Sequence, residues 1–468
     1  MLLLIKKLLL LLFSISIISC NNSEECTLDY SWIGGEIVNP HSEYVLLFKN
    51  NYLLDTIKLD NKNFFSYKTK NDKGNLYSFR NGEFQIFYLE PGDSLMLRVN
   101  TIDFDESLSY SGKGAEKNNF LMELFLKNEM DRKLVTTWYS LSPEDYEFKL
   151  DSLKEIQTKL YAQFTTKEQP SKEFMEIADA GINYAYSANK ELYTTINFMK
   201  FQSEDYIHEG FYDYRKNVDF GSETLQSYYP YYYFLDWYLD NLSFEKYFKE
   251  SKLDRKSFTH NNHKLKIIDS LISNDSLRNN MLYSLTRRCL VNGSDSEEET
   301  KILNLFLKYN NNPKQHTEMK ELARAAINLT PGQKIPNVLL VNSENTVKNL
   351  HSVIRKPTVL FFWSSLSVKH YRSMHSQAVE LSEKYPEYDF LGINTDTHFK
   401  KWRSIVLQAG FDKTSEFQFD DIEDATQKLI INSANKAIIL DKNGAILEGN
   451  SSLFSTNIES LLRGYADR

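Results

Sequence analysis

Two residues with side chains capable of nucleophilic and acid–base chemistry lie three positions apart in the last third of the chain. Ser367 and His370 follow the apolar run 358–362 and open a segment with helical periodicity, about 368–385. A serine beside a histidine could serve as nucleophile and base in a hydrolase. However, no acidic residue is evidently placed to orient the imidazole, and no glycines flank Ser367 as they would in a nucleophile elbow.

Two other interpretations of the same residues need no reaction. The Ser367 hydroxyl can cap the helix by accepting a hydrogen bond from the backbone amide near His370. Alternatively, free amides at the helix start, together with the side chains of Ser367, Lys369 and His370, could hold a phosphate or carboxylate. The sequence favours the cap, and the anion site remains a second hypothesis.

The surrounding sequence predicts an α/β domain over residues 329–468. Strand-like and helix-like patterns alternate, and a hairpin with an Asn443-Gly444 turn follows them. Such alternation indicates a sheet with both faces covered by helices. We predict strands at 338–341, 358–362 and 389–394, helices at about 368–385 and 400–409, the hairpin at 437–446 and a last helix from 457.

This order of elements resembles the TlpA/ResA family of thioredoxin-like proteins over about residues 329–465. The resemblance rests on Phe-Phe-Trp-Ser-Ser at 361–365, at the strand-to-helix turn, and on Ile-Leu-Asp-Lys-Asn-Gly at 439–444. In that family the turn carries Cys-x-x-Cys and a cis-proline precedes the hairpin. Here Ser367 and His370 occupy the cysteine positions, and Asn435 occupies the proline position. A hydroxyl cannot form a disulfide, so dithiol exchange at this turn is excluded.

The first residues predict export and a lipid anchor. Residues 1–19 combine two lysines with an apolar stretch, as in a secretory signal, and Cys20 follows. Ile17-Ile18-Ser19-Cys20 resembles a bacterial lipobox, which implies lipidation of Cys20 and attachment to a membrane. The acidic tether 20–30 resembles export signals of Bacteroidota surface lipoproteins. We therefore expect an outer-membrane lipoprotein, either on the periplasmic side or exposed at the cell surface.

The other two cysteines offer little redox chemistry. Cys26 lies on the tether and Cys289 in a helical pattern, and neither has the basic or helix-start surroundings that activate a thiol. Their separate settings also argue against a disulfide between them, although the sequence does not decide this.

The sequence between tether and α/β domain predicts two further domains, making a multidomain α+β chain. Residues 31–114 show the short alternating runs of an antiparallel β-sandwich and resemble the small N-terminal β domain of many Bacteroidota lipoproteins. Residues 115–328 predict an irregular all-α domain. One helix is expected to begin at Pro143 with Ser142 as its N-cap. Further helices are expected after Ser171, near Ser222, after Asn262, after Ser294 and at Pro313.

Two features of the helical region could bind a ligand. The aromatic stretch 228–238 could expose Tyr231, Tyr232 and Trp237 as a contact surface, although helical spacing of aromatic residues more often indicates a core. His260 and His263 have the spacing of a helical metal pair. Because Asn261-Asn262 suggests a loop and no acidic residue accompanies them, we predict no metal there.

Charge and composition limit the functions further. The net charge is −8, and removal of residues 1–19 with their two lysines takes it to −10, which argues against nucleic acid as a partner. We predict no cofactor. The sequence favours a redox-inactive binding or assembly module, a subunit of an outer-membrane complex with an outer-membrane or periplasmic protein partner. The alternative is a thiol-disulfide oxidoreductase with an atypical site.

Overall fold

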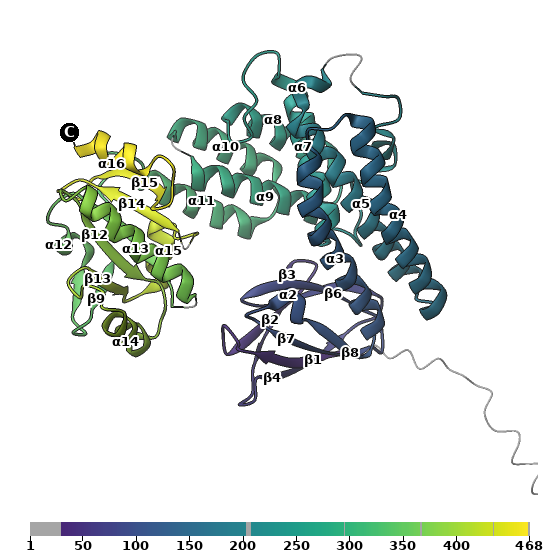
Figure 1. Ribbon diagram of the computed structural model, residues 1–468, viewed down its shortest axis with the longest axis horizontal. Helices are drawn as coiled ribbons and strands as arrows, with labels where there is room; N and C mark the ends of the chain where they lie inside the picture. Colours follow the sequence, from purple (N-terminus) through teal and green to yellow (C-terminus); the bar gives the residue numbers. More distant parts are fainter. Residues whose placement is uncertain (1–29, 203–206, 294, 366, 434, 467–468) are drawn as a thin grey trace, which may run out of the picture. The chain divides into compact units, whose positions relative to one another are not determined.

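The structure, a computed structural model, describes residues 30–202, 207–293, 295–365, 367–433 and 435–466 (Figure 1). The expected signal, Cys20, Cys26 and nearly all of the tether lie outside the described residues, so those expectations stay predictions. In the part that is described, no helix has the length and apolarity needed to cross a membrane. The chain forms two compact units: the first comprises Met1–Lys216 and Glu223–Leu235, and the second Asn217–Ser222 and Asp236–Arg468.

The first unit begins with two four-stranded sheets, in the orders β4-β1-β7-β8 and β3-β2-β5-β6. The strands are β1 (Tyr30–Val38), β2 (Tyr44–Lys49), β3 (Tyr52–Lys58), β4 (Phe64–Lys70), β5 (Asn75–Asn81), β6 (Glu83–Leu89), β7 (Ser94–Asn100) and β8 (Ser109–Lys113). Their inward side chains, among them Ile33, Leu47, Phe79 and Leu97, form one core.

The expectation of purely antiparallel pairing was wrong for one pair of strands. β1 pairs antiparallel with β4 but parallel with β7. A parallel pair requires a long connection, and the chain forms the five intervening strands before β7 returns to β1. Between β7 and β8 lies the single turn of α2 (Phe104–Ser107).

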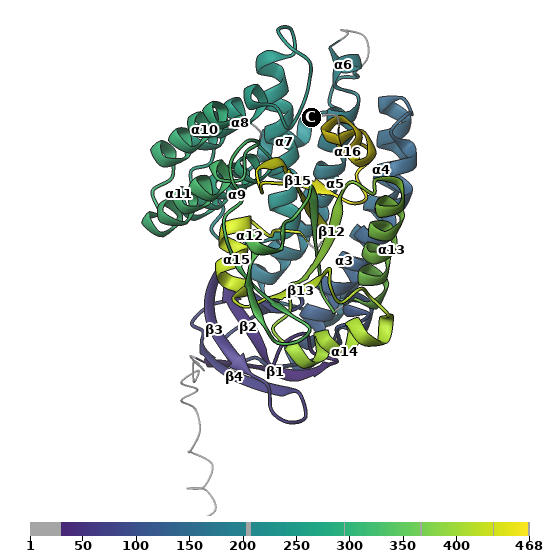
Figure 2. The ribbon, with the colours of Figure 1, turned by 90° about the vertical axis from the view of Figure 1, so that its left-hand side faces the viewer.

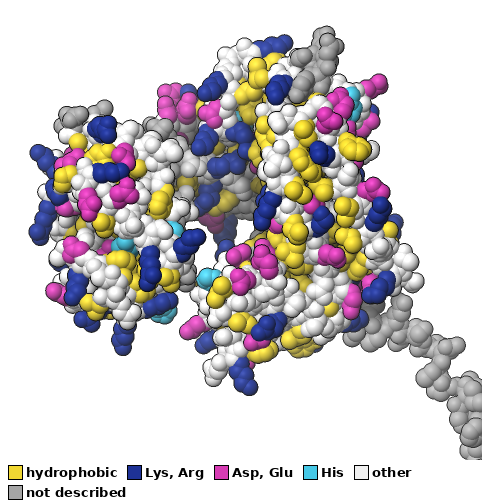
Figure 3. Space-filling view, in the orientation of Figure 1, with side chains coloured by type: hydrophobic (Ala, Val, Ile, Leu, Met, Phe, Trp, Pro, Cys, Tyr) yellow, Lys and Arg dark blue, Asp and Glu magenta, His cyan; other side chains and the backbone are white. Residues whose placement is uncertain are grey.

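Helices complete the first unit. They are α3 (Ala115–Val135), α4 (Pro143–Glu168), α5 (Lys172–Ile196), α6 (Phe198–Phe201) and the first part of α7 (Tyr229–Tyr247). The predicted cap of α4 is confirmed, because the Ser142 hydroxyl accepts from the backbone amide of Asp145 at 3.1 Å. The helix expected near Ser222 begins instead at Tyr229, with Pro230 in its first turn, where proline's missing amide breaks no helical bond. Hydrophobic side chains reach the surface along these helices (Figure 3).

The second unit contains the remaining helices of this region: α8 (Phe258–Leu271), α9 (Asp275–Asn292), α10 (Ser296–Tyr309) and α11 (Pro313–Ile327). The start expected after Asn262 was wrong, because Ser257 caps α8 by accepting from the His260 amide. The start at Pro313 is confirmed, with Asn312 as the cap. The predicted all-α region 115–328 is thus divided between the two units.

The C-terminal sheet has the order β10-β9-β13-β12-β11-β14-β15. Its elements are β9 (Leu339–Asn342), β10 (Val347–Asn349), α12 (Leu350–Val353), β11 (Thr358–Trp363), α13 (Val368–Lys384), β12 (Asp389–Asn394), α14 (Phe399–Ala409), β13 (Glu416–Phe419), α15 (Ile422–Leu429), β14 (Lys436–Leu440), β15 (Ile446–Ser452) and α16 (Ile458–Ala466). β11 runs parallel to β12 and antiparallel to β14, which pairs with β15. The order β12-β11-β14-β15 with these directions is that of the thioredoxin fold, as the resemblance implies.

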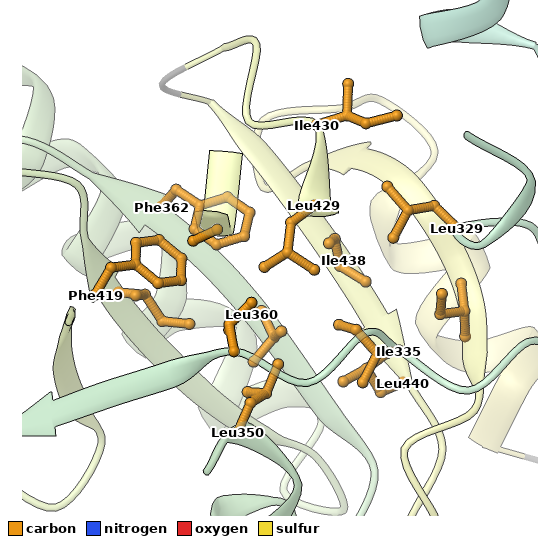
Figure 4. Close-up of a cluster of buried hydrophobic side chains, with 14 of the residues drawn as sticks. Leu329, Ile335, Leu350, Leu360, Phe362, Phe419, Leu429, Ile430, Ile438 and Leu440 are labelled. Carbon is orange, nitrogen blue, oxygen red and sulfur yellow. The ribbon is translucent and has the colours of Figure 1, made fainter. Parts of the chain in front are cut away.

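All six residues of β11 are buried, and they alternate between two cores. Leu360 and Phe362 point to the face that Leu429 of α15 and Leu350 of α12 cover (Figure 4). Trp363 points to the opposite face, which α13, α14 and α16 cover (Figure 2). β11 lies in the interior of the sheet, between β12 and β14. At the C-terminal end of β11 the chain turns into α13.

Candidate functional site

The turn between β11 and α13 is held by oxygen acceptors. Ser367 is the N-cap of α13, and its hydroxyl accepts from the backbone amide of His370 at 3.3 Å. One turn earlier, Ser364 Oγ donates to Asp396 Oδ1 at 2.6 Å, and the Ser365 amide donates to Asp396 Oδ2 at 2.7 Å. Burial alone would raise the pKa of Asp396, but these hydrogen bonds outweigh it and lower that pKa below its ordinary value. The turn is therefore fixed to the loop after β12.

His370 links the start of α13 to the loop before β14. Its Nε2 lies 2.7 Å from Asn435 Oδ1. Because a carbonyl oxygen only accepts, Nε2 carries the hydrogen in this contact. The resemblance assigned these two positions to the second cysteine and to the cis-proline, and no described peptide bond is cis. A hydrogen bond between His370 and Asn435 thus joins the two positions at which the TlpA/ResA family carries its second cysteine and its cis-proline.

A buried carboxyl lies beneath this turn. Glu416 of β13, 3% exposed, accepts from Trp363 Nε1 at 3.0 Å and lies 2.9 Å from His375 Nε2. Burial raises the pKa of Glu416, although hydrogen bonds from His375 and Trp363 oppose the shift. A Cβ at Gly392 of the neighbouring strand would lie 2.3 Å from Glu416 Oε1, so glycine leaves room for the carboxyl. This cluster ties β13, β11 and α13 together.

The proton positions in the cluster follow from the partners of His375. Its Nδ1 lies 2.7 Å from the carbonyl oxygen of Tyr371 and must donate to it. The contact between His375 Nε2 and Glu416 Oε1 then holds one further proton, shared by imidazole and carboxyl. Phe411 stacks on the imidazole with ring centroids 3.5 Å apart. His375 and Glu416 are both buried, and their contact joins α13 to β13.

A buried lysine follows Asn435. The ammonium of Lys436 donates to the carbonyl oxygens of Leu429 and Ile430, at 2.9 and 3.0 Å, at the C-terminal end of α15. Burial lowers the pKa of Lys436 to about 8. A cation at these unpaired helix carbonyls complements the negative end of the helix dipole. Lys436 therefore anchors the segment that carries Asn435.

The cysteine that the structure describes is a poor nucleophile. Cys289 lies in α9, and burial raises the pKa of its thiol to about 11. Exchange requires the thiolate, so at neutral pH this residue is present almost entirely in the unreactive form.

The candidate residues of the helical region have mixed outcomes. Tyr231 is fully buried and packs edge-on against Tyr184, which removes it from the suggested contact surface. Tyr232 and Trp237 are half-buried, and a contact role for them stays a prediction.

The histidine pair lies in α8, so the suggested loop was wrong. An acidic residue does accompany His260: Asp240 Oδ1 lies 2.8 Å from its Nε2. Lys264 also contacts this carboxylate, at 2.6 Å, so the imidazole belongs to a buried ion cluster. Sequence spacing could not show this because α7 supplies Asp240 from 20 positions away.

Four residues of the C-terminal site were not singled out from the sequence: His375, Asp396, Glu416 and Lys436. Three of them have partners far along the chain, as with Trp363 and Glu416, which are 53 positions apart. The partners of Lys436 are near in sequence, but they are backbone carbonyls, which no residue pattern reveals. One signal was present, since Glu416-Phe-Gln-Phe alternates polar and apolar residues as a strand does. It was too short to stand out.

Comparison with family models and with curated proteins finds no match. Among solved structures, a thioredoxin-like protein from Bacteroides caccae aligns at 14% identity over 60% of this chain and 94% of its own, with a TM-score of 0.37. The thioredoxin domain of a thiol-disulfide oxidoreductase from Bacteroides vulgatus aligns at 14% identity over 30% of this chain and 96% of its own, with a TM-score of 0.25. A thiol:disulfide interchange protein from Bacteroides sp. aligns at 15% identity over 30% and 89%, with a TM-score of 0.24.

The buried carboxyl yields a stability prediction. Glu416→Ala removes the acceptor of both Trp363 and His375, and the free energy of unfolding should fall by about 3–5 kcal/mol, the cost of breaking a buried pair. Glu383→Ala, at an exposed position of α13, should change it by less than about 0.5 kcal/mol. Urea unfolding followed by tryptophan fluorescence measures both. Equal losses in the two variants would contradict the positioning role.

Proposed function

We propose that this chain is a lipid-anchored envelope protein whose thioredoxin-like domain is a binding or assembly module and does not exchange thiols. The observation that supports this most is the chemistry of the β11–α13 turn. An oxygen and an imidazole stand at the two positions where exchange needs sulfur. Both are engaged in hydrogen bonds, Ser367 with the His370 amide and His370 with Asn435.

The other parts of the proposal rest on sequence features. The lipobox-like Ile17–Cys20 supports an anchor at a membrane, and the acidic tether supports export to the outer membrane. A tethered body with several domains and no reactive pair suits a subunit of an outer-membrane complex, with an outer-membrane or periplasmic protein as its partner.

The alternative function is thiol-disulfide exchange through an atypical site. It would have to use Cys26 or Cys289 without a second thiol one helical turn away. The raised pKa of Cys289 disfavours this, because so little thiolate exists at neutral pH.

A gain-of-function experiment separates the two. In Ser367→Cys/His370→Cys, one thiolate can attack a substrate disulfide, and the second thiol can then resolve the mixed disulfide, releasing the reduced substrate and leaving an intramolecular disulfide for dithiothreitol to reduce. Insulin reduction by the full-length double variant should exceed that of the wild type by roughly 10-fold or more, whereas the wild type should match buffer. Wild-type turnover that disappears in Cys289→Ser would instead establish the alternative.

The anchor is tested separately by fractionation. Cys20→Ser should move the chain from the membrane pellet to the soluble fraction, because acyl chains supply the membrane affinity. Cys26→Ser, six positions further along the same tether, should stay in the pellet. Purification of the wild type from detergent-solubilised membranes should also recover an envelope protein. A Cys20→Ser chain that stays in the pellet would refute lipid anchoring.

A further inference from the structure

The second unit contains a cavity of about 190 Å³ among α8, α9, α10 and the loop that precedes α8. Residues that line it include Arg255, Asn261, Arg288, Asp295, Glu299 and Ile302. This cavity takes no part in the β11–α13 turn. An engineered apolar cavity of about 150 Å³ holds benzene, so a volume of this size admits a ligand of roughly six to eight non-hydrogen atoms.

Three polar atoms of the lining are buried and have no hydrogen-bond partner among the described residues. They are Glu299 Oε2, Asn261 Oδ1 and Arg255 Nε. Glu299 is 6% exposed and Asn261 3% exposed. Each buried polar atom without a partner costs about 1–3 kcal/mol. Three such atoms occur around one cavity, where a ligand would supply the missing partners.

The protein holds these atoms in fixed orientations. The Asn261 amide donates from Nδ2 to the carbonyl oxygens of Ser257 and Arg255, at 2.9 and 3.1 Å, which leaves Oδ1 as an acceptor. The Arg255 guanidinium lies 3.9 Å from the ring centroid of Trp237 and pairs with Asp240. These contacts leave Asn261 Oδ1 and Arg255 Nε without a hydrogen-bond partner among the described residues.

Gly293 leaves space for the carboxyl group of Glu299. A Cβ at Gly293 would lie 2.3 Å from Glu299 Oε1, so a larger residue would displace the carboxyl. Burial, followed by the nearby Asp295 carboxylate, raises the pKa of Glu299 to about 7. Among the described residues, no Lys, Arg or His forms an ion pair with Glu299.

Both signs of charge occur around the cavity. Its lining carries three acidic residues, Asp295, Glu298 and Glu299, and three basic residues, Arg255, Lys256 and Arg288. Within the described part of the chain, no ion pair joins the two groups; Arg255, for example, pairs with Asp236 and Asp240 outside the lining. A ligand with opposite charges at its two ends would satisfy both groups together.

We propose that this cavity binds a small zwitterion of the α-amino-acid class. The ammonium group lies toward Glu299 Oε2 and Asn261 Oδ1, and the carboxylate accepts from Arg255 Nε. The side chain, limited in size by the cavity, lies toward Ile302. This site is independent of the proposed envelope function, so either can fail without the other.

Isothermal titration of the purified full-length chain at pH 8, where Glu299 is ionised, tests the site with L-alanine as the probe. Ethylamine and propionate, which carry only one of its two charged groups, are the matched controls. L-alanine should bind at least about 10-fold more tightly than either, because only it completes both sides of the cavity. No heat with L-alanine, or equal affinity for one of the controls, would overturn the proposal.

A substitution in the cavity tests whether L-alanine binds there. Glu299→Gln should weaken L-alanine binding by about 10-fold or more, since it removes the charge that faces the ammonium. Its melting temperature should equal or exceed that of the wild type, because a buried acid without a partner is removed. Glu297→Gln, at an exposed residue of the same helix that pairs with Lys301, should bind as the wild type does. Unchanged binding in a folded Glu299→Gln would place the ligand elsewhere.

Discussion

The backbone amides in the first turn of α13 have no acceptor within the helix, and they follow the fully buried strand β11. The groups that accept from these amides determine the structure of the β11–α13 turn. In a dithiol site a thiolate takes this place, stabilised by the positive end of the helix dipole. Here the Ser367 hydroxyl accepts from the helix, and the Asp396 carboxylate accepts from the preceding turn. His370 then joins the helix to Asn435. Hydrogen bonds therefore replace the reactive pair and leave the fold intact.

The state of the buried polar groups separates structural clusters from the candidate binding site. Around β13, Glu416 has partners on Trp363 and His375, and the Lys436 ammonium has two carbonyl partners. Groups satisfied within the protein stabilise it and need no ligand. In the cavity among α8, α9 and α10, by contrast, Glu299 Oε2 and Asn261 Oδ1 have no hydrogen-bond partner in the part of the chain that the structure describes. The same residue types thus have different roles, and the partners of each group distinguish them.

Much of the C-terminal fold could be predicted because its signals are local. The strand 389–394 matches β12, and the helix expected at 368–385 ends one residue earlier, at Lys384. Apolar runs and the Asn443-Gly444 turn carry that information over a few residues. β13 was missed because a four-residue strand with two polar side chains gives little periodic signal. The helix α15 was not expected either.

The site itself was predictable only in part. The positions of Ser367 and His370 followed from counting along one helix, and the structure shows the cap that this spacing favoured. The bond to Asn435 and the carboxyls of Asp396 and Glu416 come from elements 31 to 65 positions away. Only the folded sheet brings such residues together, so no spacing rule could reveal them.

An equilibrium redox titration measures whether any disulfide forms at the β11–α13 turn. Trp363 ends β11 beside the turn, so its fluorescence should respond to any disulfide that forms there. Full-length protein is equilibrated in glutathione buffers from about −150 to about −350 mV. We expect a flat signal across this range, because the turn carries no pair of thiols. A reversible two-electron transition between those potentials would overturn the proposal that the domain is redox-inactive.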